Sequence, residues 1–207
     1  MRHLRATPAS YAYSPFLPIC PPNSRRPLTR PRLLSWRAYP LFMPDNPSLA
    51  ITIRPAVSED ADGITRTYLE SAEYHAQLDP ERYWMPATDA ISARYREGRQ
   101  HPDSAEAITL VAELRGEIVG FIDARLTRSP DPMHRAMTYC HVEEIAVSSR
   151  RQNQSVGARL LRAAEDWGRE HGAQLASLEY VAVNTRASAF YERSGYRVAS
   201  ITATKRL

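Results

Sequence analysis

Three stretches of the 207-residue chain carry side chains whose types and spacing could do chemistry. A polar, basic turn, V-S-S-R-R-Q-N-Q-S-V-G-A, covers residues 147–158 and leads into a helix-like pattern. Residues 141–147, H-V-E-E-I-A-V, hold two adjacent glutamates, and residues 184–191, N-T-R-A-S-A-F-Y, end on a tyrosine. A loop before a helix binds anions, a carboxylate accepts a proton and a phenol donates one. The three stretches together could therefore supply an anion site, a base and an acid.

The turn at residues 147–158 has the features of an anion-binding loop. It follows an expected strand and opens an expected helix, where free N–H groups and the positive end of the helix dipole bind anions together. Two nucleotide-binding signatures are excluded, because neither Gly-Lys-Ser/Thr nor G-x-G-x-x-G is present. What remains is Gln152-x-x-Ser155-x-Gly157-Ala158. Ser155 falls at the expected helix start, where serine is a favoured cap with a hydroxyl that can donate to a phosphate.

This pattern resembles the acyl-CoA loop of the GNAT superfamily of N-acetyltransferases, Arg/Gln-x-x-Gly-x-Gly/Ala. Ser155 replaces the first glycine, and Gly157 matches the second. The family's downstream segment, Asn-x-x-Ala-x-x-x-Tyr-x-x-x-Gly-Phe/Tyr, is matched at every fixed position: Asn184, Ala187, Tyr191, Gly195 and Tyr196. An ordinary helix start, a helix-capping Asn184 and a core Tyr191 are the structural alternatives. Two motifs in the family's order favour the acetyltransferase interpretation over them.

The resemblance implies a site for acetyl-CoA. Backbone N–H groups of the loop would hold the pyrophosphate, and the strand before it would pair with the pantetheine amides. Asn184 would bond the same amide-bearing chain, while Ala187 and Tyr191, four residues apart, share one helix face. The expected acetyl-CoA-binding residues are Ile145, Ala146, Val147, Gln152, Asn153, Gln154, Ser155, Val156, Gly157, Ala158, Asn184, Ala187 and Tyr191.

The resemblance also implies direct acetyl transfer to an amine, with no metal. On a regular strand Glu143 shares one face with His141, while Glu144 takes the other. The family often carries its carboxylate base four or six positions before the valine that ends this strand, which matches Glu143 and, on the same face, His141. The resemblance thus implies Glu143 as the general base and Tyr191 as the general acid. Glu144 is the alternative general base, because a β-bulge in this strand would exchange the faces of the two glutamates. A chain of water molecules is a third possible route for the proton. A glutamate paired in a salt bridge and a satisfied, half-buried His141 are the structural alternatives.

The acceptor is expected to be a primary amine of a small molecule or peptide. Four residues with aromatic rings lie near the connection between the first two expected helices: Tyr74, His75, Tyr83 and Trp84. They could bind a cationic amine through cation–π contacts or pack the helices together. The alternative function is a CoA-binding sensor or assembly module without turnover. Such a module would be expected to lack the carboxylate or Tyr191, and both are present.

The hydrophobic pattern predicts an α/β fold of the α+β type, with a mixed, largely antiparallel central sheet flanked by helices. The order is β-α-α-β-β-β-α-β-α-β, and a GNAT-like arrangement follows from the resemblance. The expected strands are 50–54, 108–112, 118–122, 137–147, 175–183 and 196–204. The expected helices are 58–78, 90–98, 155–170 and 186–193.

Residues 1–48 are expected to form a disordered tail ahead of an acetyltransferase domain at 49–207. The first 44 residues hold nine of the sixteen prolines and seven arginines, without Asp or Glu. Removing those seven charges from the formal net charge of +4 leaves −3, so the basic balance says nothing about the domain. A start at Met43 is favoured over an organellar transit peptide or a nucleic-acid-binding arm, and nucleic acid is therefore an unlikely partner.

The remaining composition favours a reducing, cytoplasmic setting. Cys20 and Cys140 form neither a metal-ligand spacing nor a disulfide framework. No apolar run reaches the length of a membrane span, so no membrane partner is expected. The expected partners are acetyl-CoA and an amine acceptor, and a homodimer is an open possibility.

Overall fold

The computed structural model describes residues 51–97, 106–128, 133 and 135–206. The predicted tail, with Met43 and Cys20, lies outside these residues. The described elements are β1 (Ile51–Pro55), η1 (Ser58–Asp60), α1 (Ala61–Leu78), α2 (Thr88–Arg96), β2 (Ala107–Leu114), β3 (Glu117–Arg128), β4 (Thr138–Val147), η2 (Ser149–Arg151), α3 (Val156–Glu170), β5 (Leu175–Leu178) and α4 (Thr185–Arg193). Within the described ranges, no helix has both the length and the apolar character that crossing a bilayer requires.

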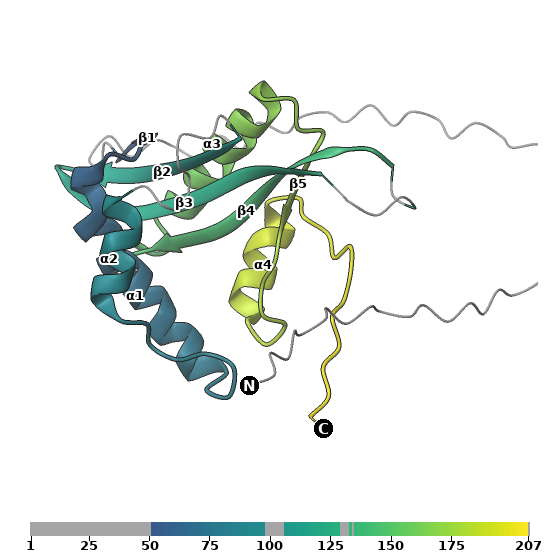
Figure 1. Cartoon of the computed structure of the whole chain (residues 1–207), viewed down its shortest axis with the longest axis horizontal. Coiled ribbons are helices and arrows are strands. Elements are labelled where there is room, and N and C mark those ends of the chain that lie inside the picture. Colours follow the sequence, from purple (N-terminus) through teal and green to yellow (C-terminus); the bar gives the residue numbers. More distant parts are fainter. Residues whose placement is uncertain (1–50, 98–105, 129–132, 134, 207) are drawn as a thin grey trace, which may run out of the picture. The chain divides into compact units, whose positions relative to one another are not determined.

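The five strands form one sheet in the order β1-β2-β3-β4-β5 (Figure 1). The first four are antiparallel, and β5 runs parallel to β4. A tight turn joins β2 to β3, with Arg115 at φ 53° and Gly116 at φ 80°. Two residues of positive φ suit a hairpin between right-twisted strands, which explains the glycine in this turn. The predicted fold class, a mixed and largely antiparallel sheet flanked by helices, is confirmed.

Helices cover both faces of the sheet, and a hydrophobic core lies between the sheet and the helices on each face. On one face lies the predicted apolar stripe of α3, with Val156, Leu160, Leu161 and Ala164 all buried. On the other face α1 and α2 pack over β3 (Figure 1), where Ile64 and Tyr95 meet Phe121. Gly168 brings α3 close to β4, because a Cβ at this position would lie 2.4 Å from the Cβ of Cys140.

Two predictions for the C-terminal region are wrong. The strand expected over 175–183 ends at Leu178, where its pairing with β4 ends. A turn follows, in which the N–H of Asn184 bonds the carbonyl of Val181 at 2.8 Å. The closing strand expected over 196–204 does not form. Its apolar residues fall on both faces of a potential strand, so neither face could be buried cleanly, and Ile201 is 87% exposed. The helix before it ends as predicted, with Gly195 at φ 91°.

Candidate active site

The sheet opens along β4. This strand pairs with β5 only over Tyr139–Val142, opposite Leu175–Leu178, and the two strands separate beyond that point (Figure 1). Its other edge stays paired with β3 as far as Val147. Among the described residues, no strand pairs with the freed edge after Val142. Its backbone N–H and C=O groups are therefore available to an amide-bearing ligand.

The loop after β4 presents unpaired backbone N–H groups. None of the N–H groups of residues 152–158 donates a hydrogen bond to another described residue. The first bond of α3 is donated by the N–H of Arg159 to the carbonyl of Ser155, at 3.0 Å. Asn153 has φ 64° and Ser155 φ 61°, and such alternation of backbone handedness curls successive N–H groups around an anion. The predicted anion loop thus forms at the positive end of a 15-residue helix.

Ser155 does not act as the predicted capping hydroxyl. It is the N-cap residue of α3, but its side chain makes no capping hydrogen bond. Its backbone lies at φ 61° and ψ 8°, in the left-handed region that glycine adopts most easily. Backbone shape explains why the loop pattern it resembles has glycine here. Gly157 is different, since a Cβ there would lie 3.5 Å from Phe190 Cζ, an ordinary contact that the fold itself would tolerate.

Glu70 on α1 holds the junction between β4 and this loop. Its carboxylate accepts a hydrogen bond from the backbone N–H of Ser149 at 2.6 Å and one from the hydroxyl of Ser148 at 3.4 Å. The sequence contained no signal for this residue, because the contact spans 79 positions and the helix pattern shows only that Glu70 lies on α1. Helix α1 therefore fixes the place where the anion loop begins.

A β-bulge in β4 changes the predicted placement of the two glutamates. Asp123 pairs with Glu144, but the next residue of β3 pairs with Val142, so Glu143 is an extra residue. Val142 and Ile145 both pack in the α3-side core, which leaves Glu143 and Glu144 on the opposite face. The expectation that these two residues take different faces is wrong, because the bulge breaks the alternation.

The two glutamates lie in different environments. Glu143 is exposed, and its carboxylate forms an ion pair with Arg125 Nε at 2.9 Å. Glu144 is half-buried. Burial, with the charge of Asp123 adding to it and that of Arg94 opposing it, raises the pKa of Glu144 to about 7. A carboxyl that titrates near neutral pH is suited to proton transfer, because it accepts a proton readily and releases it again.

Asp123 is a fully buried acid opposite Glu144. Its carboxylate accepts hydrogen bonds from Tyr95 Oη at 2.9 Å and Thr109 Oγ1 at 2.7 Å, and Arg94 Nη2 lies 4.0 Å away. Sequence reasoning did not identify Asp123. The signal was available: Asp123 is the only charged residue in the apolar run 118–124, and a buried charge is retained only where it is paired.

Tyr191 lies at the other side of the opening in the sheet, on α4. It is only 8% exposed, and its ring packs 5.4 Å from that of Tyr180 and 5.1 Å from that of Phe190. Burial, together with the charge of Glu144 and then Tyr180, raises the pKa of Tyr191 to about 12. Its hydroxyl has no hydrogen-bond partner among the described residues. The phenol is therefore protonated at neutral pH, and its hydroxyl is available to donate a hydrogen bond.

Asn184 has both a structural role and a free donor. Its Oδ1 accepts a hydrogen bond from the N–H of Ala187 at 3.0 Å and so caps α4. The residue is 7% exposed, and its Nδ2 has no acceptor among the described side chains and backbone groups. A buried amide donor without a partner destabilises a fold unless a ligand or water satisfies it. Asn184 can therefore bond a carbonyl of a bound chain.

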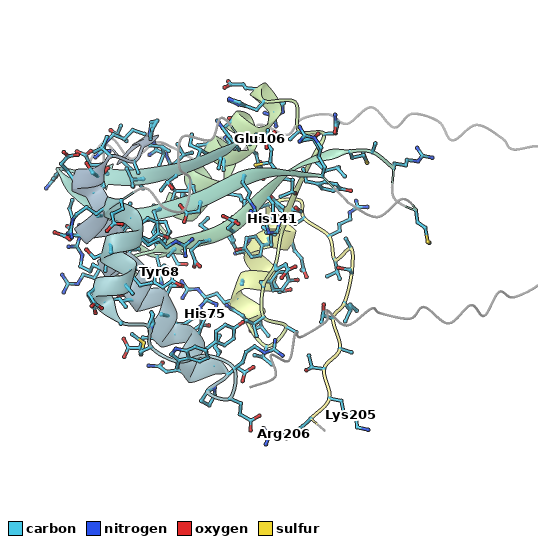
Figure 2. The ribbon with its side chains drawn as sticks, in the orientation of Figure 1. Tyr68, His75, Glu106, His141, Lys205 and Arg206 are labelled. Atoms are coloured by element: carbon cyan, nitrogen blue, oxygen red, sulfur yellow. The ribbon has the colours of Figure 1, made fainter. Side chains whose placement is uncertain are left out.

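The other sequence candidates have local partners or are exposed. His141, which is labelled in Figure 2, is half-buried. Its Nδ1 lies 3.0 Å from the hydroxyl of Ser177, as expected for a histidine with a local hydrogen-bond partner. The rings of His75 and Tyr83 pack 5.4 Å apart near the α1–α2 connection. Trp84 is 80% exposed, so the interpretation of this group as helix-packing residues does not hold for it. The same connection is reached by Arg206, which pairs with Glu81 at 2.7 Å.

The Acetyltransferase (GNAT) family pattern matches residues 66–196, which contain the open strand edge, the anion loop, Glu144 and Tyr191. The chain belongs to the GNAT acetyltransferase family. Among curated relatives, the uncharacterized N-acetyltransferase YhfO of Bacillus subtilis is 28% identical over 146 residues, covering 70% of this chain and 89% of YhfO. The aminoalkylphosphonate N-acetyltransferase of Salmonella typhimurium is 26% identical over 155 residues, covering 75% of this chain and 90% of that protein.

Solved structures share the GNAT fold. A single-residue mutant of the BH1408 protein from Bacillus halodurans aligns with TM-score 0.66 at 20% identity, over 75% of this chain and 99% of its own. The aminoglycoside N-acetyltransferase AAC(6')-Iy, in complex with CoA, aligns with TM-score 0.58 at 18% identity, over 77% of this chain and 95% of its own. These likenesses confirm the predicted fold, and the match to the family pattern confirms the predicted family. GNAT proteins use acetyl-CoA and an amine acceptor.

Proposed function

We propose that this protein transfers the acetyl group of acetyl-CoA to a primary amine of a small molecule or peptide, with Glu144 as general base and Tyr191 as general acid. The observation that carries the proposal is the open edge of β4, which runs from Glu144 to the unpaired N–H groups of residues 152–158. A chain of amides laid along this edge would have its phosphate end at the loop and its thioester end near Glu144.

Acetyl-CoA binding is assigned to backbone groups and one side chain. The N–H groups of residues 152–158 receive the pyrophosphate, aided by the α3 dipole. The free edge of Ile145–Val147 pairs with the pantetheine amides as a strand would. The Nδ2 of Asn184 donates to a carbonyl of the same chain, which would satisfy that donor. The aminoglycoside acetyltransferase that aligns with this fold is a complex with CoA, which supports the choice of ligand.

Glu144 is assigned the base role because Glu143 is exposed and already paired with Arg125. The neutral acceptor nitrogen attacks the thioester carbonyl and forms the C–N bond. The proton that this nitrogen loses goes to the Glu144 carboxylate, directly or through one water. Since the pKa of Glu144 is about 7, the carboxylate is present at neutral pH and still holds a proton well.

Tyr191 is assigned to the leaving sulfur. As the C–S bond breaks, negative charge develops on sulfur, and a buried phenol without a partner can donate a hydrogen bond to it. The phenol, with a pKa of about 12, is protonated at neutral pH and holds its proton more tightly than a thiol, whose pKa is about 8.5. The acid role of Tyr191 is therefore hydrogen-bond donation to the leaving sulfur, and the CoA thiolate takes its proton from water.

The test is an acceptor screen with the full chain, measuring the free thiol released from acetyl-CoA. The panel holds polyamines, amino acids, aminoglycosides, peptides with free N-termini and aminoalkylphosphonates, the last because a relative carries that name. Reactions without amine give the background hydrolysis. Amine-dependent thiol release, with the acetylated product seen by mass spectrometry, is the expected result. Saturable acetyl-CoA binding without thiol release across the panel would instead favour the CoA-binding sensor.

A further inference from the structure

A cluster of polar side chains surrounds Glu144 on the face of the sheet that α1 and α2 cover. One of them, Asp123, occupies the position opposite Glu144 on β3. Its carboxylate is completely buried and is held by hydrogen bonds from Tyr95 and Thr109. Arg94 precedes Tyr95 on α2, and its Nη2 lies 4.0 Å from the Asp123 carboxylate. Burying a charge destabilises a fold unless the charge is paired. The presence of buried Asp123 opposite the proposed base Glu144 therefore calls for a functional explanation.

Resting on the proposed function, we propose that Asp123 and Arg94 are positioning residues that control the charge of the Glu144 carboxyl with opposite sign. The anion of Asp123 makes it harder for Glu144 to ionise and so strengthens it as a base. The cation of Arg94 favours ionisation and keeps a useful fraction of Glu144 ready to accept a proton. Neither residue is assigned a contact with the reacting atoms.

The geometry fixes these two charges. Hydrogen bonds from Tyr95 and Thr109 stabilise the anionic form of Asp123, because both hydroxyls donate to its oxygens. Arg94 is 39% exposed at its side chain, and its guanidinium lies 5.5 Å from the centre of the Tyr95 ring. The acid is therefore fixed in the interior, while the arginine reaches it from the edge of α2.

The other titratable groups facing Glu144 add little charge near neutral pH. Burial raises the pKa of Tyr68 on α1, of Tyr95 on α2 and of Tyr191 on α4, so all three phenols stay neutral. On β4 itself, Glu143 is neutralised by Arg125 at 2.9 Å. Asp123 and Arg94 are thus the charges that act on Glu144 from β3 and α2.

The function of this arrangement is to adjust the base to its task. A glutamate at its ordinary pKa of about 4.3 is ionised at neutral pH but accepts a proton weakly. One that is too strongly shifted would be protonated already and unable to act. The anion of Asp123 opposite Glu144, with the cation of Arg94 beside Asp123, places the carboxyl between these limits. This is the condition for efficient general-base catalysis near neutral pH.

The test compares three substitutions in the full chain. Asp123→Asn removes the anion and keeps the shape, since the new amide can donate to the hydroxyl of Thr109. Arg94→Met removes the cation and keeps most of the apolar stem. Arg96→Met is the matched control, because Arg96 lies on the same helix but pairs with the exposed Asp62. Two quantities are measured: the acid limb of kcat/KM against pH, and the titration of Glu144 by ¹³C NMR of labelled glutamate carboxyls without substrate.

Both midpoints should fall by about one pH unit in Asp123→Asn and rise by a comparable amount in Arg94→Met. They should stay in place in Arg96→Met. A midpoint that does not move, or that moves in the same direction in both variants, would overturn the inference. The midpoints are measured because a loss of activity without a shift would indicate only a structural role. If Asp123→Asn does not fold, the Arg94→Met shift still decides.

The NMR titration separates this inference from the proposed function. Opposite shifts of the Glu144 carboxyl, with no matching shift in the rate profile, would support the control of Glu144 by Asp123 and Arg94 while removing Glu144 from the base role. An absence of NMR shifts would overturn the inference even if the enzyme is active.

Discussion

Asp123 and Glu144 occupy opposite positions on β3 and β4, one residue beyond the bulge created by Glu143. This pairing puts a buried acid and a half-buried acid on the same face of the sheet. The bulge is what makes the pairing possible, because an unbroken alternation would turn Glu144 toward α3. A single extra residue in β4 therefore determines which glutamate meets Asp123 and which one pairs with Arg125.

The raised pKa of Glu144 predicts a loss of stability with rising pH. Burial and Asp123 raise this pKa from 4.5 to about 7 in the folded chain. Between those values the folded state binds a proton that the unfolded state has released, so stability falls as pH increases through this window. Glutamine does not titrate, so Glu144→Gln lacks this pH-dependent loss of stability. Its melting temperature relative to the wild-type protein should therefore rise between pH 5 and pH 8.

Thermal unfolding at the two pH values measures this difference, and about 1 kcal/mol would correspond to roughly 2–4 °C in Tm. Glu143→Gln is the matched control, since its side chain is exposed and paired with Arg125. It should follow the pH trend of the wild-type protein. A Glu144→Gln variant that follows the same trend would show that this carboxyl is not shifted upward.

Ser155→Gly should stabilise the protein without weakening acetyl-CoA binding. A non-glycine residue at φ 61° carries about 1–2 kcal/mol of backbone strain, which glycine does not. The greater freedom of glycine in the unfolded chain offsets about 0.4–1 kcal/mol of that gain. Thermal unfolding should show a modest rise in Tm, and the KM for acetyl-CoA should be equal or lower.

Ser155→Ala is the control for the hydroxyl, because it keeps the Cβ and hence the strain. It should show no rise in Tm and an unchanged KM for acetyl-CoA. If both variants bind acetyl-CoA much more weakly, the hydroxyl is a direct ligand of the phosphate and the backbone explanation of Ser155 fails.

Tyr191→Phe should affect turnover rather than binding or folding. The hydroxyl has no partner among the described residues, so its removal leaves no unpaired group and Tm should not fall. Losing a group that acts only as the C–S bond breaks should lower kcat by about 10²-fold or more, while the Kd for acetyl-CoA stays within a few-fold. Steady-state rates and calorimetric titration measure the two effects. An unchanged kcat would show that water alone stabilises the leaving sulfur.

The sequence predicted the architecture well where periodicity was strong. The stripe of Val156, Leu160 and Ala164 defined α3, and Asp79 before Pro80 marked the end of α1 at Leu78. Local pattern failed for residues 196–204, because a strand at the margin of a sheet forms only if one of its faces can be buried. Val198 and Ile201 point to opposite faces of a potential strand, and both remain exposed.

The candidate site was predictable in its motifs and not in its long-range contacts. The loop at 152–158, Asn184 and Tyr191 could be named because their spacing is local. The bulge at Glu143 could not be located, because it depends on the register between β3 and β4, which spacing within one strand does not reveal. Glu70 was missed for the same reason, since its partners lie on another element. Asp123 could have been found, because it is the only charged residue in the apolar run 118–124.

The central claim is that Glu144, on the open strand β4, is the base for acetyl transfer. The most direct test is the pH profile of kcat/KM for the wild-type protein, Glu144→Gln and Glu143→Gln, using an acceptor from the screen. We predict a wild-type acid limb near pH 7, little change in Glu143→Gln, and in Glu144→Gln a fall of about 10²-fold or more at neutral pH with the limb abolished. Loss of activity and of the limb in Glu143→Gln, with Glu144→Gln still active, would contradict the account.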